Sequence, residues 1–245
     1  MPINFFYKSI ILNFFKLFIR KLAPYSSTDN FVSNDFGFSR GTPVDRWYIH
    51  QFFKNNYKFI SGDCLEFGEL TYIKKYGVNV SQKFIFNYSD TTIISNNMIQ
   101  GDLSKTFELP ELNLDCIVCV NVLNFIYDVK AALVGLRRML KQNGVVIITV
   151  AGPVAHISNY DMARWGDYWR FTDISISRLV NEAGFIVEDV KSYGNPLACV
   201  TQINGYSFED LKVESLKPNH HDYQLVIGLV ARKQEIKLKS KYYEG

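Results

Sequence analysis

Short apolar runs alternate with segments of helical spacing along most of this chain, and no other feature limits its fold as strongly. The runs expected to form strands are Cys64–Phe67, Lys83–Asn87, Met98–Gln100, Cys116–Val120, Val145–Val150, Ile186–Val190 and Leu225–Val230. Between some of them, apolar residues recur at helical spacing, as they do over 129–140 and 176–183. Strands that alternate with helices pair in parallel and carry helices on both faces of the sheet. The sequence therefore predicts an α/β fold with a doubly wound, mostly parallel sheet of seven strands.

The segment Asp161–Thr172 follows the most apolar of these runs, Val145–Val150, and has an unusual composition. Its twelve residues include two tryptophans, two arginines, two aspartates and a tyrosine. Buried charges need partners and large aromatic rings are stabilised by being covered, so this mixture suits neither a core nor a flexible linker. Open α/β sheets bind ligands beyond the carboxyl ends of their strands. We therefore expect Asp161–Thr172 to form a wall of a pocket.

The composition divides the chain into three parts, which are 1–36, 37–233 and 234–245. Pro2–Leu22 is predicted to be a basic amphipathic helix, and a polar linker follows it up to residue 36. The uncharged run inside this helix is too short to span a bilayer. Its aromatic residues and basic face favour a position on a membrane surface, while docking on the domain or on a second subunit stays open. The last part is a basic, solvated tail.

Charge and cysteine usage exclude several classes of partner. The net charge is only +3 and is concentrated at the two ends, so we expect no nucleic-acid surface. Three of the four cysteines lie in strand-like runs, which is typical of buried thiols in a reducing, cytoplasmic environment. Cys116 and Cys119 should point to opposite faces of a strand, and His220 and His221 have no further ligands nearby. We therefore predict no metal site.

Several motifs make the resemblance to a known enzyme superfamily closer than the number of strands alone does. They are Arg40–Ile49, Leu65–Glu69, Gly101–Leu103, Leu123–Asp128, Gly144–Val150, Arg164–Thr172 and Tyr193–Asn195. Together they resemble the class I S-adenosylmethionine-dependent methyltransferases, in a bacterial, type 11-like branch found with surface-polysaccharide and glycosyltransferase genes. The similarity spans about residues 36–233. It implies a Rossmann-like methyltransferase sheet and S-adenosylmethionine as cofactor.

The resemblance also implies which residues hold the cofactor. They are Glu66, Gly68 and Glu69 after the first strand, Asn87 where the superfamily has a ribose-binding acid, Asp102 for the adenine amino group, Asn121 near the methyl-transfer centre, and Arg46 and Tyr48 for the carboxylate. The loop after the first strand carries less glycine than the superfamily pattern. Asp102 could instead close a turn, and Arg46 could lie on a solvated helix face.

The acceptor side is assigned to the segment that follows the fifth strand. The candidate bases are Asp161, Asp167 and His156, and the candidate substrate-binding residues are Arg164, Trp165, Tyr168, Trp169 and Arg170. The aromatic faces suit a sugar ring or a hydrophobic lid. Two alternatives stay open, since His156 can be structural and Asp167 can pair with Arg164 or Arg170 and only hold the loop.

These residues lead to three functional hypotheses. The first is a methyltransferase that acts on a saccharide or glycolipid intermediate at the cytoplasmic face of the membrane, where the protein would be peripheral. The second is a catalytically inactive methyltransferase-like module in a polysaccharide assembly complex, because the ribose acid and several loop glycines are missing. A nicotinamide-dependent oxidoreductase is less favoured, since no Gly-x-Gly-x-x-Gly follows the first strand. The oligomeric state stays open.

Overall fold

The computed structural model describes residues 31–234. The predicted amphipathic helix at 2–22 and most of the basic tail lie outside these residues. Among the described residues, no helix has the length and apolar character needed to cross a membrane.

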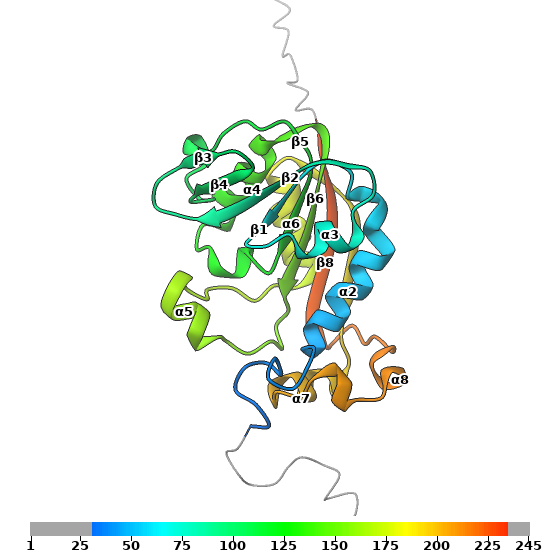
Figure 1. The fold of residues 1–245 in the computed structure, drawn as a ribbon. Coiled ribbons are helices and arrows are strands. Elements are labelled where there is room, and N and C mark those ends of the chain that lie inside the picture. The colour runs from blue at the N-terminus through cyan, green and yellow to red at the C-terminus, as the bar shows by residue number, and fades with distance from the viewer. Residues whose placement is uncertain (1–30, 235–245) are drawn as a thin grey trace, which may run out of the picture. The chain divides into compact units, whose positions relative to one another are not determined.

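One sheet organises the described residues (Figure 1). Its strands are β1 (Gly62–Phe67), β2 (Val80–Tyr88), β3 (Ile93–Ser95), β4 (Met98–Gly101), β5 (Leu114–Val120), β6 (Leu140–Ala151), β7 (Phe185–Tyr193) and β8 (Val226–Lys233), in the spatial order β3-β4-β2-β1-β5-β6-β8-β7. From β4 to β6 the neighbours are parallel, and β8 runs antiparallel to both β6 and β7. All seven predicted strands are confirmed. The eighth, β3, was not predicted, because all three of its residues are exposed and give no burial pattern.

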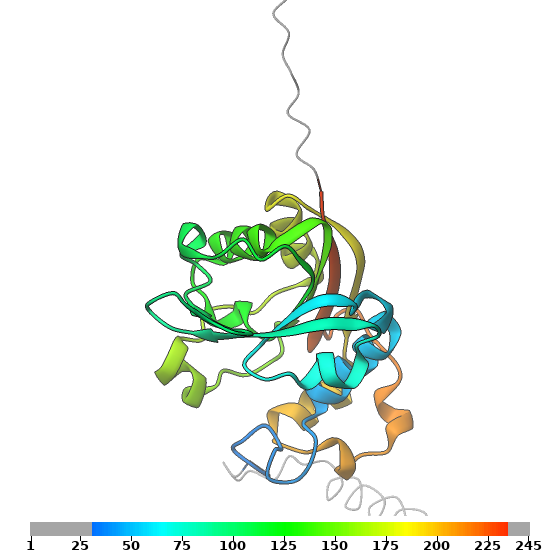
Figure 2. The same cartoon turned by 45° about the horizontal axis from the view of Figure 1, so that its top comes forward.

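Helices cover both faces of the sheet (Figure 2). The α-helices are α2 (Val44–Asn56), α3 (Thr71–Tyr76), α4 (Val129–Met139), α5 (Asn159–Trp165), α6 (Asp173–Glu182), α7 (Pro196–Ile203) and α8 (Val213–Leu216), and the 3-10 helices are η1 (Tyr57–Phe59), η2 (Thr106–Glu108), η3 (Leu123–Phe125) and η4 (Phe208–Asp210). One apolar core joins α4 and α6 to the sheet, and a second joins α2 and α3 to the opposite face. Cys119 belongs to the first core and Cys116 to the second, so the predicted opposite orientation of these two thiols is confirmed.

Two helices begin in different ways. Thr172 caps α6, since its side chain accepts a hydrogen bond from the Ser175 N–H at 3.1 Å. Within the described residues, no side chain caps the start of α2. The Thr42 hydroxyl instead donates to Glu209 at 2.8 Å and ties the chain before α2 to η4.

The connection from β7 to β8 contains α7 and α8, and α7 packs against α2. Neither helix was predicted from the sequence. Asn195 caps α7 by accepting from the Ala198 N–H at 2.9 Å, and Pro196 follows in the first turn. A cap followed by proline is a helix start signal that our prediction did not use. Figure 1 shows α5, α7 and the chain before α2 at the same end of the sheet.

Candidate functional site

A cavity of about 760 Å³ opens beyond the carboxyl ends of the central parallel strands. The ends of β1, β2, β4 and β5 contribute Gly68, Asn87, Asp102 and Asn121 to its wall, and α5 closes it from the other side. This is the edge of the sheet at which open α/β folds bind their ligands.

A second cavity of about 260 Å³ adjoins the first. The two share Asn121, Phe125 and Trp165 in their walls. Its remaining polar lining comes from α2, η3, α5 with the chain on either side of it, and α7. These residues are Asp45, Arg46, Asn124, His156, Ser158, Asp161, Asp167, Arg170 and Gln202. The site therefore has two adjoining compartments, which we call the larger and the smaller cavity.

The loop after β1 brings one of its three predicted residues to the larger cavity. Gly68 has a φ of +77°, a conformation that favours glycine, and a Cβ there would meet nothing within 4 Å. Glu66 instead accepts hydrogen bonds from the N–H groups of Tyr72 and Ile73 at the start of α3, with N–O distances of 2.9 Å. Burial raises the pKa of Glu66 to about 7. Glu66 and the exposed Glu69 are absent from the wall of the larger cavity, and Glu69 instead lines, with Gly68, a separate cavity of about 480 Å³.

Asn87 and Asp102 come from adjacent strands. Asn87 of β2 pairs in register with Gln100 of β4, and Asp102 directly follows β4. Asp102 Oδ1 accepts from the backbone N–H of Ser104 at 2.9 Å and from its hydroxyl at 2.7 Å. Asp102 therefore closes a turn and also lies in the wall of the larger cavity.

Asn121 lies where the two cavities meet. It follows β5 in the left-handed conformation, with a φ of +52°, and its backbone N–H donates to the Thr149 carbonyl oxygen at 2.8 Å. Its side-chain Oδ1 accepts from the Thr149 hydroxyl at 3.3 Å. These bonds to β6 fix the residue that separates the two compartments.

The two predicted residues on α2 go to different places, because side chains two positions apart on a helix do not share a face. Arg46 lines the smaller cavity, and its Nη1 donates to the Tyr72 hydroxyl at 3.3 Å. Burial acts to lower the pKa of Arg46, but the charges of Asp45, Tyr72 and Asp161 raise it. Tyr48 is buried in the core, and its hydroxyl donates to the Leu216 carbonyl oxygen at 2.8 Å. The prediction that Tyr48 binds the cofactor is therefore wrong.

Asp167 and Arg170 form a buried ion pair, which we call the clasp. Two N–O contacts join the side chains, at 2.5 and 2.8 Å. Arg170 also donates to the carbonyl oxygens of Ala155 and His156, and Asp167 accepts from the Ser158 N–H at 2.9 Å. Burial acts to raise the pKa of Asp167, but these hydrogen bonds and the charge of Arg170 lower it.

The clasp corrects two predicted roles. A carboxylate held by an arginine with a lowered pKa is a poor proton acceptor, so Asp167 is not assigned as a base. The guanidinium of Arg170 donates its hydrogen bonds to other groups of the protein, so Arg170 is not assigned to the substrate. Both residues line the smaller cavity, where they fix the chain on either side of α5.

His156 and Asp161 are the two remaining candidate bases, and both line the smaller cavity. The His156 ring stacks on Phe36, with centroids 4.1 Å apart. Burial and the nearby charge of Arg170 lower the pKa of His156, so its imidazole is neutral at pH 7. Asp161 lies in the first turn of α5, where its backbone N–H donates to the Ser158 hydroxyl at 3.1 Å.

The predicted substrate residues on and after α5 separate into two groups. Arg164, Trp165 and Tyr168 line the larger cavity, and Trp165 reaches both compartments. Trp169 lines neither cavity, since its indole N–H donates to the Tyr127 carbonyl oxygen at 3.1 Å. Trp169 therefore anchors the segment, and its assignment to the substrate is corrected.

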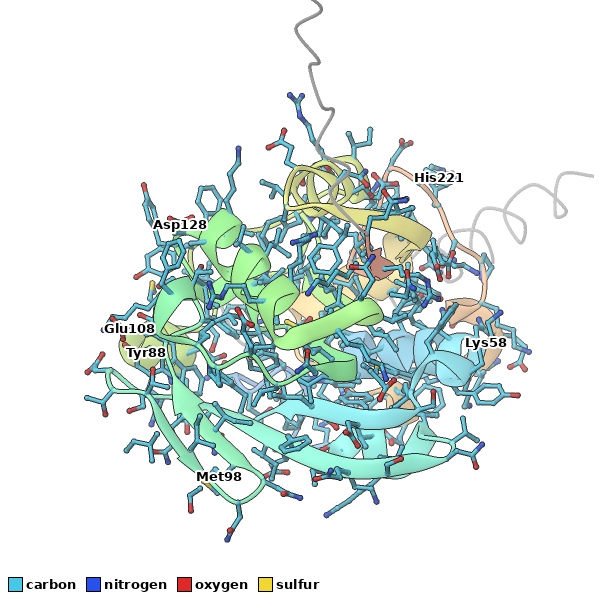
Figure 3. All side chains as sticks on the ribbon, turned by 90° about the horizontal axis from the view of Figure 1, so that it is seen from above. Lys58, Tyr88, Met98, Glu108, Asp128 and His221 are labelled. Carbon is cyan, nitrogen blue, oxygen red and sulfur yellow. The ribbon has the colours of Figure 1, made fainter. Side chains whose placement is uncertain are left out.

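Several residues of the site were not predicted. Tyr88, Phe125 and Tyr127 line the larger cavity, and Phe36, Phe38, Asp45 and Gln202 line the smaller one. Figure 3 shows Tyr88 at one margin of the fold and His221 at the opposite side, and His221 lines neither the larger nor the smaller cavity. An aromatic residue at a strand end was the signal that could have identified Tyr88, and one shortly after a strand end could have identified Phe125.

The larger cavity suits a nucleoside. Phe67 and Phe86 supply an apolar surface, and Asn87 offers an amide that can both donate to and accept from hydroxyl groups. Oδ2 of Asp102 has no hydrogen-bond donor among residues 31–234, so it can accept a bond from an amino group. The donor and acceptor set thus fits the adenosine part of a cofactor.

Comparison with known proteins finds similarity over part of the chain. Residues 61–148 match a protein family described as "Methyltransferase domain". A search of curated proteins gives no match. Among solved structures, a methyltransferase from Mesorhizobium loti is 14% identical, with a TM-score of 0.47, over 71% of this chain and 93% of its own. One from Archaeoglobus fulgidus is 13% identical, with a TM-score of 0.47, over 77% and 94%.

The family match begins just before β1 and ends within β6, so it covers the strands whose ends form the larger cavity. The sheet adds a β8 that runs antiparallel between β6 and β7. The described residues therefore form a Rossmann-like α/β sheet, and residues 61–148 within it are similar to a methyltransferase domain.

Proposed function

We propose that this protein is an S-adenosylmethionine-dependent methyltransferase that acts on a saccharide or glycolipid intermediate of surface-polysaccharide synthesis at the cytoplasmic face of the membrane. The observation that carries the proposal is the junction of the two cavities at Asn121. One compartment suits a nucleoside, and the adjoining one contains the two candidate bases. This arrangement would bring a methyl donor and an acceptor group together out of bulk water.

The larger cavity holds the cofactor in this proposal. Asn87 donates hydrogen bonds to the ribose hydroxyls and accepts hydrogen bonds from them. Asp102 accepts a hydrogen bond from the adenine amino group. Gly68 allows the chain to approach closely, and Arg46, which lines the smaller cavity, pairs with the cofactor carboxylate where the cofactor reaches that compartment. When bound, S-adenosylmethionine supplies an activated methyl group on a sulfonium.

The smaller cavity orients the acceptor. Asp161 or His156 takes the proton that the acceptor group loses, since both line this compartment and neither is neutralised by the clasp. Trp165 covers the junction and keeps water out. These are roles of position and proton transfer, which methyl transfer requires from a protein.

A saccharide acceptor is supported by the aromatic rings around the cavity mouth. Tyr127, Tyr168 and Trp165 are 71%, 52% and 45% exposed, although each lines the larger cavity. Large aromatic rings left open beside a pocket suit the apolar faces of sugar rings. Contact with the membrane is proposed for 2–22 on its sequence alone.

Two measurements test the proposal. Calorimetry with S-adenosylhomocysteine should show binding, and radiolabelled methyl groups should pass to lipid-linked glycans or nucleotide sugars. Absence of binding at millimolar cofactor product would reject the enzyme and favour the inactive, methyltransferase-like scaffold. Binding with methylation of non-saccharide acceptors only would reject the acceptor class.

Asp102→Asn should weaken S-adenosylhomocysteine binding about tenfold, the effect of one hydrogen bond lost at a buried polar contact. The amide keeps an oxygen for the Ser104 turn but presents a donor where the adenine amino group needs an acceptor. Calorimetry measures the change, and Asp90→Asn on the exposed loop after β2 is the control. Equal affinities of the Asp102 variant and the unaltered protein would remove Asp102 from the cofactor site.

Asn87→Asp should strengthen the same binding by about threefold to tenfold. A carboxylate accepts from both ribose hydroxyls, and hydrogen bonds to a charged group are stronger than those to an amide. Titration of the variant beside the unaltered protein checks this. A loss of affinity would show that Asn87 does not face the ribose.

A further inference from the structure

The smaller cavity holds more negative charge than its own residues neutralise. Asp45 and Asp161 both line it, while Asp167 and Arg170 cancel each other in the clasp. Arg46 offsets one of the two remaining carboxylates. Among the described residues, the lining therefore carries a net charge of about −1, since His156 is neutral at pH 7.

These carboxylates are not used by the fold. Asp45 Oδ1 accepts only from the backbone N–H of the next residue, at 2.7 Å. Within residues 31–234, the Asp161 carboxylate has no hydrogen-bond donor, and the buried His156 Nδ1 has no hydrogen-bond partner. Buried polar atoms without partners are rare in folded proteins, so His156 Nδ1, beside the two half-buried carboxylates, points to a ligand that supplies donors.

Aromatic rings complete the lining. Phe36, Phe38, Phe125 and Trp165 contribute to the wall. Phe36 has a φ of +61°, which is uncommon for a bulky side chain, and its ring lies against His156. Strained backbone of this kind gathers at functional sites. Aromatic faces beside carboxylates make a favourable environment for a cation.

The charge and the rings together select among saccharides. A phosphate or carboxylate group would be repelled by Asp45 and Asp161. A neutral hydroxyl would leave the surplus charge unmatched. We propose that the acceptor carries a protonated amino group that binds in the smaller cavity between Asp45, Asp161 and the aromatic wall. This inference rests on the proposed function and narrows its acceptor to an amine-bearing saccharide.

Calorimetry on the full-length protein saturated with S-adenosylhomocysteine tests the inference with three probes that share one sugar ring. They are glucosamine, glucose and glucuronic acid. Glucosamine should bind saturably, and the other two should bind at least about tenfold more weakly, as expected for a lost charge-assisted contact. Asp45→Asn and Asp161→Asn should each weaken glucosamine binding about tenfold, and the exposed Asp222→Asn should not change it.

The other outcomes overturn the inference or the proposed function separately. If glucose binds as tightly as glucosamine, or glucosamine does not bind saturably, the amine assignment is wrong. If Asp45→Asn weakens S-adenosylhomocysteine as much as glucosamine, the charge serves the cofactor and the inference is also wrong. Failure of S-adenosylhomocysteine to bind, with glucosamine still bound by the protein alone, rejects the proposed function but leaves the amine site.

Discussion

Asp167→Asn is expected to lower the free energy of unfolding by about 3 kcal/mol, because it removes one partner of a buried ion pair and leaves the other charge uncompensated. The side chains of Asp167 and Arg170 are only 2% and 19% exposed. Arg170 would retain the carbonyl oxygens of Ala155, His156 and Trp169 but no negative charge. Urea unfolding at neutral pH measures the loss.

A second carboxylate-to-amide change supplies the control. Glu182 pairs with Lys130 and Arg178 on the surface of α6, and Glu182→Gln should leave the unfolding midpoint unchanged within error. The clasp variant should also raise the acceptor KM more than it changes cofactor affinity, since it frees the chain that carries His156 and Asp161. Equal stability of Asp167→Asn and the unaltered protein would show that the clasp is not structural.

Glu66→Gln is expected to change how stability depends on pH. Burial raises the Glu66 pKa from 4.5 to about 7, so between these values the folded protein keeps a proton that the unfolded chain releases. The free energy of unfolding must therefore fall as pH rises through this window, by about 3 kcal/mol in total. The variant removes this contribution.

His50 acts in the opposite direction over a similar range. Burial and the charges of Lys75, Arg46 and Lys54 lower its pKa from 6.5 to about 4, so here the unfolded chain binds the extra proton and stability rises with pH. The effect is smaller, because His50 is half-exposed and its charge is screened.

Chemical unfolding between pH 4.5 and 7 tests both groups. The free energy of unfolding of the unaltered protein should fall as pH rises. In Glu66→Gln only the contribution of His50 remains, so the free energy of unfolding should rise with pH. The exposed Glu108→Gln is the control and should follow the unaltered protein. If the free energy of unfolding of Glu66→Gln depends on pH in the same way as that of the unaltered protein, Glu66 ionises normally.

The sequence predicted the sheet well because burial leaves a strong pattern. Runs such as Val145–Val150 are covered on both faces, which requires apolar side chains at every position. The edge strand β3 has no buried residue and so no pattern. α7 was missed although Asn195 and Pro196 mark its start, since the prediction weighed apolar spacing over capping residues.

The site was predicted in part, and its errors have physical causes. Residues that directly follow strands, such as Gly68, Asp102 and Asn121, were placed correctly at the cavity, because the sheet fixes where strands end. Tyr48 was misplaced because it lies on a different face of α2 from Arg46, and this face is buried in the core. Asp167 and Trp169 took internal partners, and the choice among neighbouring partners depends on loop geometry that residue types do not reveal.

The helix α5 buries none of its side chains and is fastened mainly at its two ends. With so little covered surface to hold it, its amide hydrogens should exchange with solvent far faster than those of β6. One wall of the site therefore opens to water at a free-energy cost well below that of unfolding the sheet.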